Sequence, residues 1–149
     1  VFLMTNAYER FMQSVYTPMR QQLVENGFTE LTTEEEVTNK MDALSGTALI
    51  VINSVCGCAA GQARPAVIEA ITEVDKKPDH LLTVFAGQDK EATAKMRSYF
   101  ADIPASSPSI ALWKDGELVA FIPRELIEEN EKDMIKTHLI GLLNQFLSA

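Results

Sequence analysis

Residues 47–58, with the sequence TALIVINSVCGC, decide the fold of this chain. Their first seven residues, Thr47–Asn53, form an apolar run rich in β-branched side chains, which is typical of a buried strand. The small residues that follow Cys58 predict the first turns of a helix. Cys56 and Cys58 are the chain's two cysteines, so both thiols fall where a strand ends and a helix begins.

A thiol at the start of a helix faces unpaired backbone N–H groups and the positive end of the helix dipole. Both stabilise the thiolate over the thiol, and the thiolate is the reactive form. Two such thiols one residue apart predict chemistry on sulfur. The alternative is that Cys56 and Cys58 are buried structural residues that happen to lie close together.

Composition narrows the class of protein. The 149 residues suffice for one domain with a core, 46% are hydrophobic and 23% charged, and the net charge is −8. This charge argues against sequence-independent nucleic-acid binding, and no apolar run reaches the length of a membrane span. Residues 1–5 are too short for a signal peptide and lack a basic region. With two cysteines, we expect a cytoplasmic protein in which any disulfide is transient and catalytic.

Hydrophobic periodicity and turn residues predict the remaining elements. We expect helices at about 6–26 (kinked or divided at Pro18), 32–44, 58–75 (kinked at Pro65), 89–100 and 131–147, and strands at 47–53, 80–86, 109–113 and 118–122, the last two joined by a hairpin turn at 114–117. The two strands joined by a helix should be parallel through a right-handed crossover, and the hairpin antiparallel. The result is one α/β domain spanning 1–149, with a mixed sheet of about four strands, helices on both faces, and residues 1–26 as a helical extension packed on it.

Two resemblances extend this interpretation. This order of elements, with the segment SPSIALWKDGE at 107–117, resembles the thioredoxin fold, in which the proline equivalent to Pro108 is cis and packs beside the dithiol. The segments NSVCGCAAG at 53–61, ARPA at 63–66, TVFAGQDKEATA at 83–94 and PASSPS at 104–109 resemble the bacilliredoxins. These small proteins reduce mixed disulfides between cytosolic proteins and bacillithiol. Members often carry another cysteine at the extreme C-terminus, where this chain reads FLSA.

The resemblance assigns the thiols their roles. Cys56, in the more N-terminal and more exposed position, is the expected nucleophile, and Cys58 is the expected resolving thiol. Closing a disulfide across one residue requires a tight turn, which Gly57 favours, and such a small ring should be strained and oxidising. The alternative for Cys58 is packing beneath the helix.

Other candidate residues gather at the same sheet edge. Pro108 opens a strand antiparallel to the one ending at Asn53, so it should lie beside the cysteines, with Ser107 offering backbone groups to an extended substrate. Gln88 and Asp89 follow the second parallel strand and leave the sheet at this edge, where ligands commonly bind; Asp89 could instead cap a helix. Arg64 could bind a carboxylate of a small thiol or support the thiolate, or else lie on a solvated face. We count all of these, with Gly57 and Asn53, as candidate substrate-binding residues.

A metal site is not expected. Cys56, Cys58, His80 and His138 would supply zinc ligands by number. However, His80 begins the strand parallel to the one that ends near the cysteines, so about six residues place it roughly 20 Å away. The acidic clusters are interpreted as a helix start and a solvated face, at Glu34, Glu35 and Glu36 and at Glu128, Glu129 and Glu131.

The sequence therefore predicts a thiol–disulfide oxidoreductase of bacilliredoxin type that removes bacillithiol from modified cytosolic proteins. Its partners would be S-bacillithiolated proteins, bacillithiol as the thiol co-substrate and a bacillithiol disulfide reductase system, with no nucleic acid, membrane or organic cofactor. The alternatives are a general protein disulfide isomerase or reductase, and a redox sensor or adaptor that oxidises without turnover.

Overall fold

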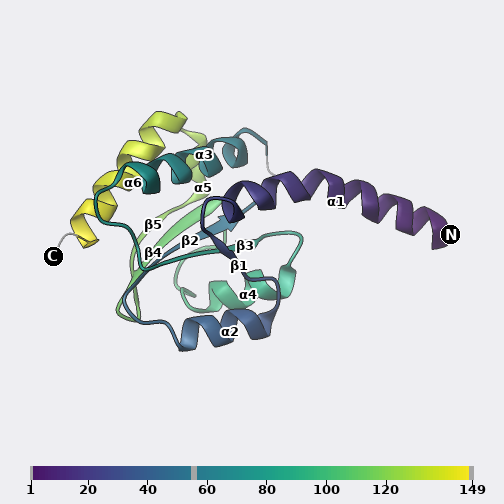
Figure 1. The fold of residues 1–149 in the computed structure, drawn as a ribbon, viewed down its shortest axis with the longest axis horizontal. Helices are drawn as coiled ribbons and strands as arrows, with labels where there is room; N and C mark the ends of the chain where they lie inside the picture. Colours follow the sequence, from purple (N-terminus) through teal and green to yellow (C-terminus); the bar gives the residue numbers. More distant parts are fainter. Residues whose placement is uncertain (1, 55–56, 148–149) are drawn as a thin grey trace.

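A five-stranded mixed sheet lies at the centre of the computed structural model, which describes residues 2–54 and 57–147 (Figure 1). The strand order is β1-β3-β2-β4-β5. The first three strands in this order run parallel to one another, and β4 and β5 run antiparallel to their neighbours. The strands are β1 (Thr29–Glu30), β2 (Thr47–Asn53), β3 (His80–Phe85), β4 (Ser109–Lys114) and β5 (Glu117–Ile122).

The central strand β2 is buried on both faces, as its apolar run predicts. Leu49 and Val51 point into a core on one face of the sheet, while Ile50 and Ile52 point into a second core on the other. This separation follows from the alternation of side chains along a strand. Helices must therefore cover both faces, which confirms the predicted class of mixed α/β sheet.

The helices divide between the two faces. In Figure 1, α3 and α6 lie above the sheet and α2 and α4 below it. Each pair also makes mutual contacts, so each face is closed by two packed helices. The helices are α1 (Phe2–Val24), α2 (Glu34–Asp42), α3 (Gly57–Glu73), α4 (Lys90–Ser98), α5 (Arg124–Glu128) and α6 (Lys132–Leu147).

Local signals behave largely as predicted. The Thr33 side chain accepts a hydrogen bond from the Glu36 N–H, and the Glu36 carboxylate accepts one from the Thr32 N–H, so a capping arrangement begins α2. Asp115 and Gly116 both adopt positive φ, 52° and 85°, which suits the tight turn between β4 and β5.

Two prolines lie inside helices without ending them. Helix α1 runs unbroken through Pro18, so its predicted division is wrong, and α3 continues through Pro65. A proline removes one backbone donor, but long helices anchored at other positions tolerate that loss. Two elements, β1 and α5, were also missed, because runs of two and five residues give no detectable period.

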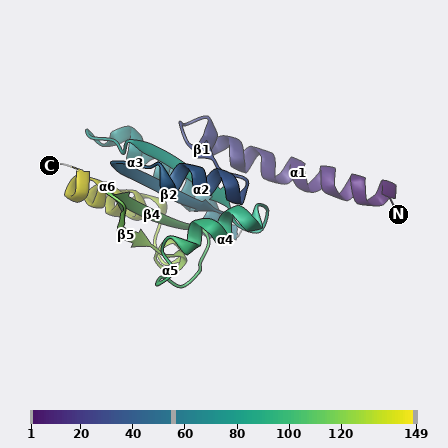
Figure 2. The ribbon, with the colours of Figure 1, turned by 90° about the horizontal axis from the view of Figure 1, so that it is seen from below.

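Helix α1 has two unlike halves. Its C-terminal part is anchored by Leu23, which is completely buried in the core beneath α3. Its N-terminal part extends away from the sheet in both views (Figures 1 and 2), and Phe11 there is 64% exposed. No helix in the described residues has both the length and the hydropathy needed to cross a bilayer.

Candidate functional site

The candidate site lies where β2 ends and α3 begins. The described part of β2 ends at Asn53 and Ser54, both 2% exposed, and α3 starts at Gly57. Cys56 falls between them and lies outside the described residues, as does the side chain of Cys58, whose backbone belongs to the first turn of α3. The predicted end of a strand at Asn53 and the predicted start of a helix near Cys58 are confirmed.

Pro108 approaches this junction from β4. The Ser107–Pro108 peptide bond is cis, as the resemblance to the thioredoxin fold implied. Ser109 is the register partner of Ile52, so continuing this antiparallel register by one residue places Pro108 beside Asn53. The two predicted site residues thus lie on adjacent strands at the same sheet edge.

Two arginines hold the loop that leads into Pro108. Arg97 Nη2, from α4, donates to the Ser106 carbonyl at 3.1 Å, and Arg124 Nη1, from α5, donates to the Ser107 carbonyl at 3.1 Å. The Ser107 carbonyl, expected to receive substrate, is therefore already bound by a side chain. Sequence reasoning missed both arginines, although Arg124 directly follows the proline that ends β5.

A hollow opens on the outer side of this loop. Its volume is about 380 Å³. It is lined mostly by apolar side chains of the loop and of β5 and by one carboxylate. The lining residues are Ile103, Pro104, Ala105, Ser106, Phe121, Pro123 and Glu125.

Arg64 is buried rather than solvated, so the alternative of a solvated face is wrong. It is 7% exposed. Its Nη1 donates to Asn53 Oδ1 at 3.0 Å and to the Ser54 carbonyl at 2.8 Å, and its Nε donates to Gln22 Oε1 at 3.0 Å. Arg64 therefore extends from α3 and binds the end of β2.

The turn after β3 reaches the same edge. Ala86 N–H donates to the Asn53 carbonyl at 3.0 Å, which joins the ends of β2 and β3. Gln88 is exposed. Asp89 occupies the N-cap position of α4, but its side chain makes no capping hydrogen bond. Its Oδ2 lies 2.7 Å from Arg20 Nη1 instead, so Asp89 occupies the N-cap position suggested above without capping the helix through its side chain.

The last turns of α1 complete this edge, which the sequence did not predict. Arg20 pairs with Asp89, its guanidinium carbon lies 4.9 Å from the Phe85 ring centroid, and the Tyr16 ring packs edge-on against Phe85. The Met19 carbonyl accepts a hydrogen bond from Asn53 Nδ2. The sequence did contain a sign that Arg20 is partly buried. One face of the helix carries, at three- and four-residue spacing, Tyr16, Met19, Arg20 and Leu23, so a charged residue lies within an otherwise apolar stripe.

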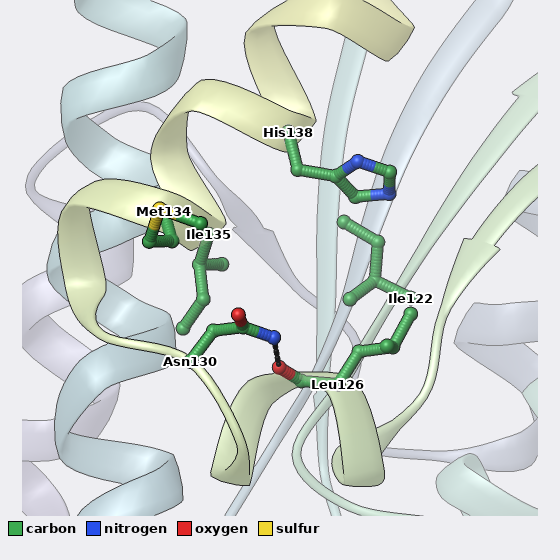
Figure 3. A pocket seen from close by; sticks show the side chains of 6 residues that line it. All are labelled: Ile122, Leu126, Asn130, Met134, Ile135 and His138. Atoms are coloured by element: carbon green, nitrogen blue, oxygen red, sulfur yellow. Dashed lines mark hydrogen bonds between the residues drawn. The ribbon is translucent and has the colours of Figure 1, made fainter.

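The two histidines belong to different elements of the fold, β3 and α6. His80 pairs with Ala48, at the opposite end of β2 from Asn53, as the predicted register requires. His138 lies on α6 and lines a hollow of about 180 Å³ between β5, α5 and α6 (Figure 3). Within the described residues, no three histidine, cysteine, aspartate or glutamate side chains form a group that could hold a metal ion.

Known proteins are similar to this chain in sequence. The profile of a family described as "Disulphide isomerase" matches residues 11–147. A bacilliredoxin of Bacillus cereus is 60% identical over 91% of this chain and 94% of its own length. One from Geobacillus kaustophilus is 52% identical over 96% and 99%, respectively.

Solved structures support the fold. Thioredoxin f2 of Chlamydomonas reinhardtii superposes with a TM-score of 0.55 over 80% of this chain and 95% of its own, at 14% identity. Thioredoxin O2 of Arabidopsis thaliana gives 0.53 over 82% and 96%, at 15% identity. The fold is thioredoxin-like, and the chain belongs to the bacilliredoxin family of thiol–disulfide oxidoreductases.

Proposed function

We propose that the protein removes bacillithiol from mixed disulfides on cytosolic proteins, with Cys56 as the nucleophile and Cys58 as the resolving thiol. The observation that carries this proposal is that β2 ends at Asn53 and α3 begins at Gly57, so that the Cys56-Gly57-Cys58 sequence spans the start of α3, while cis-Pro108 falls beside Asn53 at the same sheet edge. Its relatives over nearly the whole chain are named bacilliredoxins.

The first step is a thiol–disulfide exchange. The Cys56 thiolate attacks the bacillithiol sulfur of the modified protein, and the sulfur–sulfur bond to the protein breaks. The protein cysteine leaves as a thiolate and takes a proton from solvent, while Cys56 becomes linked to bacillithiol. One disulfide forms as another breaks, so no external oxidant or reductant is consumed.

The second step clears Cys56. The Cys58 thiolate attacks the Cys56 sulfur, which releases bacillithiol and leaves a Cys56–Cys58 disulfide. Alternatively, free bacillithiol attacks the bound bacillithiol sulfur and gives bacillithiol disulfide and the Cys56 thiolate. The internal disulfide must then be reduced by two electrons, for which a bacillithiol disulfide reductase system would be the ultimate source.

This function places the protein in the cytoplasm, where bacillithiol would serve as co-substrate and no organic cofactor would be required. Gly57, Asn53, Ser107, Pro108, Gln88 and Asp89 are the residues we propose for binding the modified protein. Pro108 and Asn53 would lie directly beside the reacting sulfur, while exposed Gln88 would extend the surface toward the turn after β3.

Turnover on two substrates tests the proposal. One substrate is a protein carrying a single bacillithiol mixed disulfide, and the other is a protein with scrambled internal disulfides. With bacillithiol supplied, we expect many turnovers on the first substrate and little regain of native pairing on the second. Stoichiometric oxidation without turnover would instead indicate a redox sensor and would overturn the proposal.

A general disulfide isomerase is the second candidate. The description of the matching family favours it. An isomerase must both open and remake protein disulfides, so the scrambled substrate would regain native pairing at a rate comparable with bacillithiol release. That result would replace the first candidate with the second.

A further inference from the structure

Arg64 is a buried cation whose partners are all neutral. The guanidinium hydrogen bonds go to an amide oxygen of Gln22, an amide oxygen of Asn53 and the Ser54 carbonyl. Among the described side chains, no carboxylate bonds or pairs with Arg64. Burial accordingly lowers the pKa of the Arg64 guanidinium from its ordinary value. Removing a charge from water is costly unless an opposite charge compensates, and the described side chains supply no such charge at Arg64.

The neighbouring Arg20 shows the contrast. Its Nη1 lies 2.7 Å from both Asp89 Oδ2 and Glu30 Oε2. Burial alone would lower the Arg20 pKa, but the hydrogen bonds and charges of the two carboxylates raise it overall. At the same sheet edge, therefore, one arginine has two carboxylates and the other has none.

The dithiol segment, which adjoins Ser54 along the chain, can supply an anion. Ser54, whose carbonyl Arg64 binds, precedes Cys56 by two residues, a chain length of at most about 7 Å. Arg64 lies in α3, six residues after Cys58, and long helical side chains lean toward the helix N-terminus. Among the described residues, nothing accepts a hydrogen bond from Arg64 Nη2, which leaves donors for a sulfur.

We propose that Arg64 is the positioning residue of the dithiol, binding the end of β2 through Asn53 and Ser54 and supplying the buried positive charge that stabilises the Cys56 thiolate. This inference rests on Cys56 being the nucleophile of the proposed function. The thiolate would be an anionic partner for Arg64. Its negative charge would offset the energetic cost of burying the guanidinium, and the guanidinium would in turn favour the reactive thiolate form of Cys56.

The other charges that act at this edge do not replace Arg64. The charge of Arg20 is offset by its two carboxylates. The two arginines that contact the loop before β4, one from α4 and one from α5, bind carbonyls of that loop. The charged groups concerned are Arg20 on α1, Glu30 on β1, Asp89 after β3, Arg97 on α4 and Arg124 on α5.

The test measures the pKa of the Cys56 thiol in a Cys58→Ser background, from the rate of iodoacetamide alkylation against pH. Arg64→Gln should raise this pKa by about one unit, so that alkylation at neutral pH slows by roughly five- to tenfold. Arg64→Lys keeps the positive charge, so it should raise the Cys56 pKa by less than half as much as Arg64→Gln does. Lys136→Gln removes a positive charge on α6 that pairs with Glu69 and Glu73, and should leave the pKa unchanged.

The inference is overturned if Arg64→Gln gives the same pKa as Lys136→Gln, or if Arg64→Lys shifts the pKa as far as Arg64→Gln. Should Arg64→Gln not fold, Gln22→Glu replaces it. That substitution places a carboxylate 3.0 Å from Arg64 Nε, on α1 and outside the dithiol segment, without removing the arginine. A raised Cys56 pKa supports the inference, and an unchanged one overturns it.

These measurements use no bacillithiol. A protein that fails to release bacillithiol but shows the Arg64 shift would contradict the proposed function and leave this inference standing. A protein that releases bacillithiol but shows no pKa shift in Arg64→Gln would support the proposed function and contradict this inference.

Discussion

Arg20 Nη1 lies 2.7 Å from Asp89 Oδ2, and this ion pair joins α1 to the turn that follows β3. Both side chains are largely buried, at 21% and 16% exposed. The guanidinium also packs on Phe85 and pairs with Glu30. The last turns of α1 are therefore a structural part of the candidate site.

Arg20→Ala should lower the free energy of unfolding by about 2 kcal/mol, because it leaves two carboxylates without their shared partner and exposes Phe85. Urea denaturation measures this change. Lys132→Ala, which breaks the more exposed pair with Glu69, is the matched control and should cost clearly less, because solvent screens an exposed ion pair. Equal losses in the two variants would show that α1 is not anchored by Arg20.

The cap of α2 should give stability a defined pH dependence. Hydrogen bonds from the Thr32 N–H and hydroxyl lower the pKa of Glu36 below its ordinary value of 4.5. A carboxyl whose pKa is lower in the folded state stabilises the fold above the unfolded pKa, and this stabilisation is lost as the pH falls through the folded pKa. Glu36→Gln should therefore destabilise at neutral pH but much less at roughly pH 3.

Unfolding by urea at the two pH values measures this difference. Glu117→Gln, on β5 and outside the cap, should have the same small effect at both. If Glu36→Gln destabilises equally at neutral and acidic pH, the depressed Glu36 pKa does not contribute to stability.

Arg124 should affect the position of the loop before β4 rather than the pKa of the Cys56 thiol. Arg124→Ala removes the hydrogen bond to the Ser107 carbonyl, so release of bacillithiol from a modified protein should slow about fivefold, equivalent to about 1 kcal/mol. The alkylation pKa of Cys56 should change little. Steady-state turnover with the modified protein and alkylation against pH separate the two effects.

Glu128→Gln is the control for this variant, because it removes the ion pair of Arg124 with Glu128 but keeps the bond to Ser107. It should retain nearly full turnover. Equal slowing in both variants would mean that the ion pair, and not the loop contact, affects turnover.

Strong local patterns made much of the fold predictable. The run Thr47–Asn53 is buried on both faces and has one stable location, at the centre of a sheet. The Asp115-Gly116 turn requires positive φ and so marks a hairpin. Strand β1 could not be predicted in the same way, since its two residues are strand only because Thr29 and Glu30 pair with β3.

The site was predictable in position but not in its contacts. The order of strands and helices brings Asn53, Pro108 and Asp89 to one edge, which the sequence pattern indicated. Whether an arginine lies in solvent or beneath a strand depends on tertiary packing, and this explains why the contacts of Arg20 and the burial of Arg64 emerged only from the structure.

Mass spectrometry of the Cys58→Ser variant after incubation with a bacillithiol-modified protein tests the central claim most directly. If Cys56 attacks the bacillithiol sulfur, this variant should gain the mass of one bacillithiol at Cys56 while the substrate loses it, and Cys56→Ser should gain none. A Cys58→Ser variant that stays unmodified beside an intact substrate, or a Cys56→Ser variant that takes up bacillithiol, would contradict the account.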